Sequence, residues 1–209
     1  MEFEIKSYRV GMIQTNCYFL INKDTSEVVI VDPGDEASRL AAEIEREGLK
    51  PAAVLLTHGH FDHITGVNDL VAKFPMPVYI HESEKDLLAS EKSNPFSPVK
   101  GEFKLNVDNF IQGEPTLDIA GFSIKVYTTP GHTPGGVCFY LKDQDVLFSG
   151  DTLFCGSVGR TDFPGGSMSQ LVRSVKDKLF ELPESTKVYP GHEGATSIAF
   201  EKQYNPFIN

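Results

Sequence analysis

The sequence predicts a layered domain of the α+β or α/β class, in which helices pack outside β-sheets. Two observations support this fold class. Runs of β-branched residues alternate with segments of helical periodicity in the first half, and several strand patterns follow one another closely in the second half. The chain has 209 residues, 40% of them hydrophobic, which is enough to bury a substantial core without disulfides.

Glycine and proline delimit the elements expected in the first half. The β-branched run VVIVDPG (28–34) ends at Pro-Gly, and residues 35–47 carry apolar side chains at helical spacing before Gly48, which suits the end of a helix. The patterns that follow predict a buried strand at 53–57, a helix through Val67 to Phe74 that Pro75 closes, a strand at 77–80 and a short helix near 83–89.

The second half begins with a polar, proline-containing stretch, residues 90–100, that we interpret as a loop. The patterns after it predict strands at 122–128, 137–141 and 145–149, a helix from about Ser167 to Leu182 with Ser167 as its N-cap, a strand at 187–190 and a last helix from about Thr196. Repeats and low-complexity linkers are absent from the sequence, so we expect a single domain over residues 1–209.

Composition and charge exclude several classes of partner. The chain has 19 basic and 29 acidic side chains and a net charge of −10, which opposes binding to a phosphate backbone and disfavours a nucleic-acid partner. No window approaches the length of a membrane span, and the start MEFEIKSYRV lacks the features of a signal peptide. We therefore expect a cytoplasmic protein without a membrane partner. Cys17, Cys138 and Cys155 show no CxxC spacing and are expected to be buried free thiols.

Five of the six histidines fall in three short polar segments, each of which follows a predicted strand. These segments are THGHFDH (57–63), TTPGHTPGG (128–136) and YPGHEG (189–194). Loops at strand ends can present side chains to a common point, and imidazole and carboxylate suit zinc, iron and manganese. The candidate metal ligands are His58, His60, Asp62, His63, His132, Asp151 and His192.

Seven ligands are too many for one tetrahedral ion, but they suffice for two ions if one carboxylate is shared. His58 and His60 point the same way in an extended segment, whereas Asp62 and His63 follow a further kink and can serve a neighbouring ion. Asp151 and a hydroxide are the natural bridges between two dications. A solvated polar loop is the alternative explanation for the segment around His58.

Other candidates are open to simpler explanations when taken singly. A lone Gly-His in a turn is often no ligand, so His132 and His192 depend on the whole constellation, and Asp151 by itself suits a turn or an N-cap. His81, at a strand end, has no partners in the sequence, and we expect it to be structural or to face solvent.

In order and spacing, the Asp of VDPG and the segments THGHFDH, GHTPGG, GDTLF and PGH resemble the metallo-β-lactamase superfamily over nearly the whole chain. The resemblance implies an α+β fold, a four-layer αβ/βα sandwich, with a dinuclear site at one edge. It implies that His58, His60 and His132 hold the first metal, that Asp62, His63 and His192 hold the second, and that Asp151 bridges them. Asp32 would orient a ligand histidine, although a carboxylate in a Pro-Gly turn is an alternative.

Within that superfamily, GDTLF followed by GSVGRTDFPGGS (156–167) resembles glyoxalase II, or hydroxyacylglutathione hydrolase, and its shorter bacterial relatives. Glyoxalase II carries an additional helical C-terminal region that helps to bind glutathione, whereas this chain stops at Asn209, soon after the PGH segment. The commonest true lactamases have a Cys at the bridging position, where this chain has Asp151, so we disfavour β-lactam hydrolysis.

The resemblance thus implies a dinuclear metal-dependent hydrolase that cleaves a thioester by means of a metal-bridging hydroxide, with Asp62 and Asp151 as catalytic side chains. The expected cofactors are two divalent ions, zinc first and iron or manganese as alternatives. The expected partner is a small-molecule thioester of the S-acylglutathione type. The physiological substrate, the metals and the oligomeric state stay open.

Three alternative functions remain. The segment Arg160 to Phe163 also resembles the iron-dependent persulfide dioxygenases of the same fold. Arg160 could contact an anionic substrate or pair with Asp162. A non-catalytic metal-binding protein is the second alternative. The third, an RNA phosphodiesterase, is disfavoured by the acidic charge and by the lack of an inserted basic arm.

Overall fold

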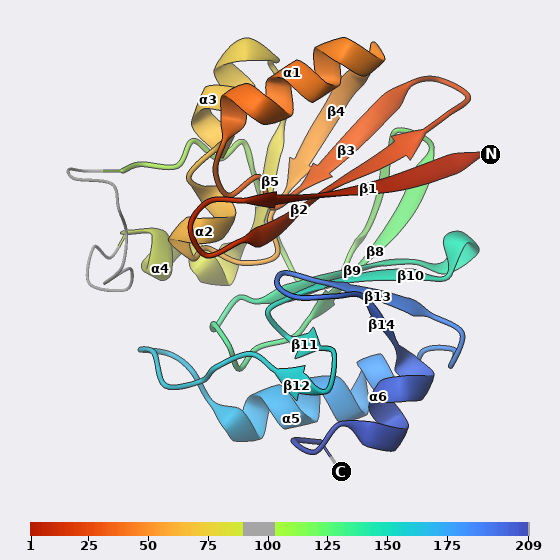
Figure 1. Ribbon diagram of the computed structural model, residues 1–209. Coiled ribbons are helices and arrows are strands. Elements are labelled where there is room, and N and C mark those ends of the chain that lie inside the picture. The colour runs from red at the N-terminus through yellow and green to blue at the C-terminus, as the bar shows by residue number, and fades with distance from the viewer. Residues whose placement is uncertain (90–102, 209) are drawn as a thin grey trace.

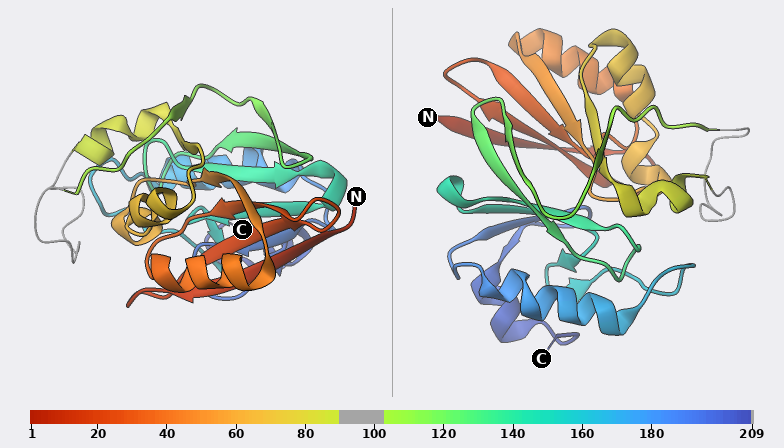
Figure 2. Two further views of the ribbon diagram at one scale, coloured as in Figure 1. Left: turned by 90° about the horizontal axis from the view of Figure 1, so that it is seen from above. Right: turned by 180° about the vertical axis from the view of Figure 1, so that it is seen from behind.

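The computed structural model describes residues 1–89 and 103–208, which form two facing β-sheets with helices on both outer faces (Figure 1). The first sheet has the strand order β1-β2-β3-β4-β5-β6 and the second β14-β13-β10-β9-β8-β7, while β11 and β12 form a separate ribbon. The helices α1 and α3 cover the first sheet, and α5 and α6 cover the second, as the views from above and behind also show (Figure 2). The expected α+β four-layer sandwich is confirmed.

The chain elements alternate as follows. The strands are β1 (Phe3–Val10), β2 (Thr15–Asn22), β3 (Glu27–Val31), β4 (Lys50–Leu55), β5 (Val78–His81), β6 (Asn109–Ile111), β7 (Thr116–Ile119), β8 (Phe122–Thr128), β9 (Val137–Leu141), β10 (Val146–Gly150), β11 (Leu153–Phe154), β12 (Ser157–Val158), β13 (Lys187–Pro190) and β14 (Thr196–Ser197). The helices are α1 (Ala37–Glu47), α2 (Phe61–Ile64), α3 (Val67–Lys73), α4 (Lys85–Ala89), α5 (Met168–Asp177) and α6 (Ile198–Tyr204), with short 3-10 turns η1 (Glu82–Glu84), η3 (Lys142–Gln144) and η4 (Leu179–Glu181).

Each central strand serves two cores because its side chains alternate between faces. In β2, Cys17 and Phe19 pack with the helices outside the first sheet, whereas Tyr18 and Leu20 pack between the two sheets. The third core joins the second sheet to α5 and α6. A strand buried on both faces reads as a continuous apolar run, and this explains why β2, β3 and β9 are buried throughout or nearly so.

Several predicted boundaries match the structure closely. Ser167 caps α5 by accepting a hydrogen bond from the Gln170 N–H, and Gly48 ends α1 in the left-handed conformation, as predicted. The expected helix from Ser167 to Leu182 is interrupted, because it leaves helical geometry at Lys178 and continues only as the η4 turn. The last helix begins at Ile198, two residues later than predicted, because Thr196 and Ser197 pair with β13.

Other expectations were incomplete or wrong. No strand was expected before residue 28, yet β1 and β2 form a long antiparallel hairpin. The short strands β6, β7, β11, β12 and β14 were also not predicted, because their pairing partners determine them more than their own sequence patterns do. Cys17 and Cys138 are buried as expected, but Cys155 is exposed, because it lies in the turn between β11 and β12. The predicted loop at 90–100 lies outside the described residues.

None of the helices among the described residues is long and apolar enough to cross a bilayer. The fold also explains where the polar segments go. Asp32 follows β3 and His58 follows β4, and these two strands are parallel; likewise Asp151 follows β10 and His192 follows β13, which are also parallel. Since the carboxyl ends of parallel strands meet at one edge, the topology gathers these segments at one edge of the sandwich.

Candidate metal centre

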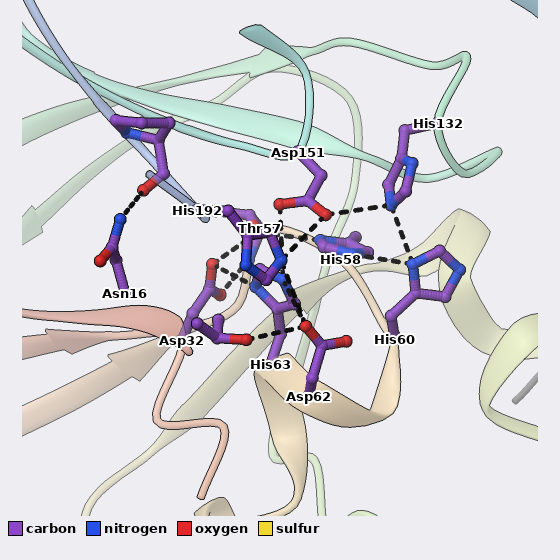
Figure 3. Close-up of polar contacts among 12 residues, drawn as sticks. Asn16, Asp32, Thr57, His58, His60, Asp62, His63, His132, Asp151 and His192 are labelled. Atoms are coloured by element: carbon purple, nitrogen blue, oxygen red, sulfur yellow. Dashed lines mark hydrogen bonds and ion pairs between the residues drawn. The ribbon is translucent and has the colours of Figure 1, made fainter. Parts of the chain in front are cut away.

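All seven predicted ligand side chains converge at the edge where the two sheets meet (Figure 3). Their donor atoms form overlapping groups in which every atom lies within 4.8 Å of the others. These groups are His58, His60 and His132; Asp62, His63 and His192; and His58, His63 and Asp151. We call the first the three-histidine cluster and the second the carboxylate cluster. Together, the seven side chains form a site capable of binding metal ions. The structure brings the candidate ligands together in the two sets of three that the resemblance implied.

In the three-histidine cluster, three ring nitrogens face a common point. His60 Nδ1 lies 3.0 Å from His58 Nε2 and 2.9 Å from His132 Nε2. Nitrogens bound to a tetrahedral zinc at about 2.0–2.1 Å lie roughly 3.3 Å apart, so these nitrogens need to move apart only by a few tenths of an ångström to match a zinc site. All three histidines are buried.

In two of the three rings, those of His58 and His132, hydrogen bonds on the outer side fix which nitrogen carries the proton. The Thr57 hydroxyl donates to Asp32 and therefore accepts from His58 Nδ1, at 3.1 Å. His132 Nδ1 donates to the Arg160 carbonyl at 2.7 Å. In both rings the Nε2 lone pair is thereby left facing the cluster, in the tautomer that a metal ligand needs.

The carboxylate cluster carries more charge. His63 Nε2 lies 3.5 Å from Asp62 Oδ2, and His192 Nε2 lies 3.3 Å from the same oxygen. Thr15 donates a hydrogen bond of 2.8 Å to Asp62 Oδ2. On its outer side, His63 Nδ1 donates to Asp32 Oδ2 at 3.0 Å. Asp32 thus accepts a hydrogen bond from a candidate ligand histidine, which is the contact expected of a residue that orients that ring.

Asp151 lies between the two clusters. Its Oδ2 is 3.5 Å from His132 Nε2 and 3.5 Å from His192 Nε2, and its Oδ1 is 3.4 Å from His63 Nε2. The glycine of the PGH segment makes this approach possible, because a Cβ on Gly191 would lie only 2.2 Å from Asp151 Oδ1. One carboxylate therefore faces both groups of donors, as a bridging ligand requires.

Burial and charge separate the pKa values of the two clusters. Burial lowers the pKa of His58 well below its usual value and, with the neighbouring His132, lowers that of His60 to about 3. For His192, burial acts in the same direction, but hydrogen bonds to Asp151 and Asp62 raise the pKa to about 9. Burial also opposes the charged form of His63, yet the charges of Asp62, Asp151 and Asp32 raise its pKa well above the usual value.

The donor set itself tests whether metal ions fit. Two buried atoms at the centre, His63 Nε2 and Asp151 Oδ1, make no well-formed hydrogen bond among the described residues and meet each other only in an ion-pair contact of 3.4 Å. Buried polar atoms are rarely left without a partner unless they serve an ion, a water or a ligand. The nitrogen and oxygen donors belong to the types that zinc, iron and manganese accept, so the residues fit two divalent ions.

Two residues that support the site, Thr57 and Thr15, were not predicted from the sequence. Thr57 begins the THGHFDH segment and links Asp32 to His58, and Thr15, in a strand that was not predicted, contacts Asp62. Arg160 forms the ion pair with Asp162 that was one of its two expected roles, with Nε and one terminal nitrogen each 2.7 Å from a carboxylate oxygen. His81 is buried and caps the η1 turn by accepting from Ser83 N–H, so it is structural rather than solvent-facing.

Comparison with known proteins agrees with this geometry. The sequence profile described as the metallo-beta-lactamase superfamily matches residues 10–192. The chain belongs to the metallo-β-lactamase superfamily. It is 43% identical over 202 residues to the probable metallo-hydrolase YqgX of Bacillus subtilis, covering 96% of this chain and 95% of the relative. It is 37% identical over 203 residues to the hydroxyacylglutathione hydrolase GloC of Haemophilus influenzae, with 96% and 95% covered.

Solved structures of metallo-β-lactamase-fold proteins are also similar. BLEG-1, described as a B3 metallo-β-lactamase, superposes with a TM-score of 0.92 at 42% identity, covering 98% of this chain and 99% of that chain. The di-iron form of TTHA1623 gives 0.85 at 36% identity, with 97% and 99% covered. ETHE1 from Myxococcus xanthus gives 0.76 at 29% identity, with 99% and 84% covered. Membership of this superfamily supports a metal-dependent hydrolase.

Proposed function

We propose that this protein is a dinuclear metal-dependent thioesterase that acts on S-acylglutathione-like substrates, such as hydroxyacylglutathione. The observation that carries the proposal is Asp151, whose carboxylate faces both clusters of donors within about 3.5 Å. The relative GloC, described as a hydroxyacylglutathione hydrolase, supports the substrate class, because it aligns over 95% of its own length.

The three-histidine cluster and the carboxylate cluster would each hold one divalent ion, with Asp151 serving both. Zinc is the ion that we propose first, and iron or manganese are the alternatives. Bound together, two such ions would supply a hydroxide nucleophile at neutral pH and would polarise the substrate carbonyl. Asp62, held by Thr15, is in place to orient the attacking water. A thiolate is a good leaving group, so the reaction needs no strong general acid from the chain.

Aromatic rings flank the donors on two sides. The Phe163 ring meets His60 edge to face with centroids 5.7 Å apart, and the Phe154 ring meets His192 with centroids 6.1 Å apart. Both phenylalanines are half-buried and offer apolar contacts to an acyl group. Arg160 lies over the Phe163 ring at 3.9 Å, where its guanidinium could exchange Asp162 for a substrate carboxylate.

The test is hydrolysis of S-lactoylglutathione by protein loaded with zinc, iron or manganese. We expect turnover by the wild type and a loss of turnover in Asp151→Ala, while Asp118→Ala, an exposed acid on β7, keeps wild-type activity. Turnover that persists in Asp151→Ala would exclude this site as the catalyst. A protein that binds two ions but hydrolyses no thioester or ester would instead fit the non-catalytic metal-binding alternative.

An iron-dependent persulfide dioxygenase is the second candidate. The segment Arg160 to Phe163 resembles that class of enzyme, and TTHA1623, which is 36% identical, has been solved in a di-iron form. Oxygen uptake with glutathione persulfide by the iron-loaded protein would favour this function. The absence of uptake, together with thioester hydrolysis, would exclude it.

The 42% identity to BLEG-1, described as a B3 metallo-β-lactamase, requires a β-lactam in the same panel. We expect the thioester to be the better substrate, because the side chain proposed as the bridge is Asp151 and not a cysteine. A kcat/KM for a cephalosporin above that for S-lactoylglutathione would reverse this assignment.

A further inference from the structure

Glu84 is a fully buried carboxylate that belongs to neither cluster of donors. It lies in the η1 turn, between β5 and α4 (Figure 1), and its exposed fraction is 0%. A buried carboxylate is costly unless it is hydrogen-bonded, and both oxygens of Glu84 accept backbone hydrogen bonds of 2.7 Å. The donors are the N–H groups of Gly59 and Gly135.

These two glycines lie in the loops that carry the three-histidine cluster. Gly59 stands between His58 and His60 in the loop that leaves β4 of the first sheet. Gly135 stands three residues after His132 in the connection from β8 to β9 of the second sheet. One carboxylate therefore joins two loops that come from opposite sheets, next to all three candidate ligands.

The fit around the carboxylate is close. A Cβ on Gly135 would lie 2.7 Å from Glu84 Oε1, and a Cβ on Gly59 would lie 3.0 Å from Oε2. Glycine at both positions thus allows the backbone N–H groups to reach the carboxylate. Each loop donates to one oxygen of the same carboxylate, so the carboxylate holds the two loops at a fixed separation. That separation in turn sets the distance of 2.9 Å between His132 Nε2 and His60 Nδ1.

We propose that Glu84 is a positioning residue that sets the geometry of the three-histidine cluster by tying its two loops together, and thereby controls the affinity of that cluster for a divalent ion. The inference rests on the proposed ligand roles of His58, His60 and His132. It does not depend on the thioesterase assignment, because metal affinity can be measured without a substrate. Positioning groups of this kind typically change metal affinity by about 10- to 100-fold.

The test compares Glu84→Gln with the wild type in Zn²⁺ titrations against a chromophoric chelator. Glutamine keeps the shape of the side chain but has only one acceptor oxygen, so one N–H group loses its partner. We expect the affinity of one of the two sites to fall by about 10- to 100-fold and that of the other to change by less than about threefold. Asp86→Asn, at an exposed position on α4, is the matched control and should leave both affinities unchanged.

The affected site is identified by repeating the titration in a His192→Ala background, which removes a donor of the carboxylate cluster and leaves the three-histidine cluster complete. The Glu84→Gln effect should persist there. Equal weakening of both sites, or a lowered melting temperature with unchanged zinc affinities, would overturn the proposal and leave Glu84 a purely structural residue.

Two further variants apply if Glu84→Gln does not fold. Glu84→Asp keeps both acceptor oxygens but withdraws them by one methylene, and Gly135→Ala displaces the carboxylate from the other side of the contact. Each should weaken the same single zinc site. Failure of both to do so would overturn the proposal, whereas weakened zinc binding without any thioester hydrolysis would leave it intact and contradict only the proposed function.

Discussion

The three-histidine cluster and the carboxylate cluster lie side by side, yet they differ in charge. His58 and His60 have lowered pKa values and are neutral at pH 7, and the rings of His58 and His132 donate on their outer sides to a hydroxyl and a carbonyl. The carboxylate cluster instead contains Asp62 and faces Asp151, and these two carboxylates raise the pKa values of its histidines, with Asp32 adding to the effect at His63.

This difference indicates how the site accommodates two dications. In the three-histidine cluster, His58 and His60 are already neutral, and the cluster depends on backbone contacts, including those to Glu84, to hold its rings in position. In the absence of metal, the carboxylate cluster keeps its negative charges balanced by protons on His63 and His192. An ion entering that cluster replaces protons rather than filling a neutral site.

We expect the largest effect from removing the Asp151 carboxylate, which the two clusters share. In Asp151→Ala both clusters lose the carboxylate that faces them, so we expect activity to fall by on the order of 1,000-fold or more and the tightly bound metal to fall below two ions per chain. Thioester assays and elemental analysis after dialysis measure the two effects. If the variant retained two tightly bound ions, Asp151 would not be a shared ligand.

The second prediction concerns pH. Because the pKa of His192 is raised to about 9 and that of His63 is raised well above its usual value, both rings are protonated at pH 7 without metal. Binding to the carboxylate cluster should therefore release up to about two protons, and its affinity should rise with pH up to about 9. Because His58 and His60 are already neutral at pH 7, ion binding to the three-histidine cluster should release fewer protons than binding to the carboxylate cluster.

Isothermal titration calorimetry at pH 7.0 in buffers of different ionisation enthalpy counts these protons for each ion bound. The same titration in a His192→Ala background, in which the three-histidine cluster stays complete, identifies the binding event that releases fewer protons as binding to that cluster. Equal proton release for both ions would contradict the charge difference between the clusters.

The third prediction is that Asp32→Asn lowers zinc affinity mainly at the carboxylate cluster. The variant weakens the hydrogen bond from His63 Nδ1, so we expect zinc affinity at the carboxylate cluster to fall by about 10- to 100-fold. The three-histidine cluster should change less, because Asp32 reaches His58 only through the Thr57 hydroxyl. Chelator competition resolves the two affinities. A larger loss at the three-histidine cluster would contradict the proposed division of roles.

The smallest effect is expected from Thr15→Val. This change removes one hydrogen bond of 2.8 Å to Asp62 Oδ2 while nearly preserving the shape of the side chain. A hydrogen bond to a charged carboxylate contributes about 1.5 kcal/mol at the low end of its range, so affinity at the carboxylate cluster should fall by about 10-fold with no change at the other cluster. Thr116→Val, at an exposed position on β7, is the control in the same titration.

Much of the fold and the site could be predicted because the relevant signals are local. The helical spacing before Gly48 and the cap at Ser167 depend on residues within a few positions, and both were correctly placed. The β1–β2 hairpin and the short strands were missed, because β2 is buried on both faces and lacks alternation, while two-residue strands such as β11 depend on their partners.

The sequence by itself identified the candidate donors: five histidines and two aspartates at strand ends, chemically suited to two divalent ions. Only the tertiary structure decided what holds them. Thr15 contacts Asp62 across 47 residues, Gly135 contacts Glu84 across 51, and His63 contacts Asp32 across 31. Such contacts depend on how the two sheets pack and in which register, and that packing reflects the whole hydrophobic core rather than any local pattern.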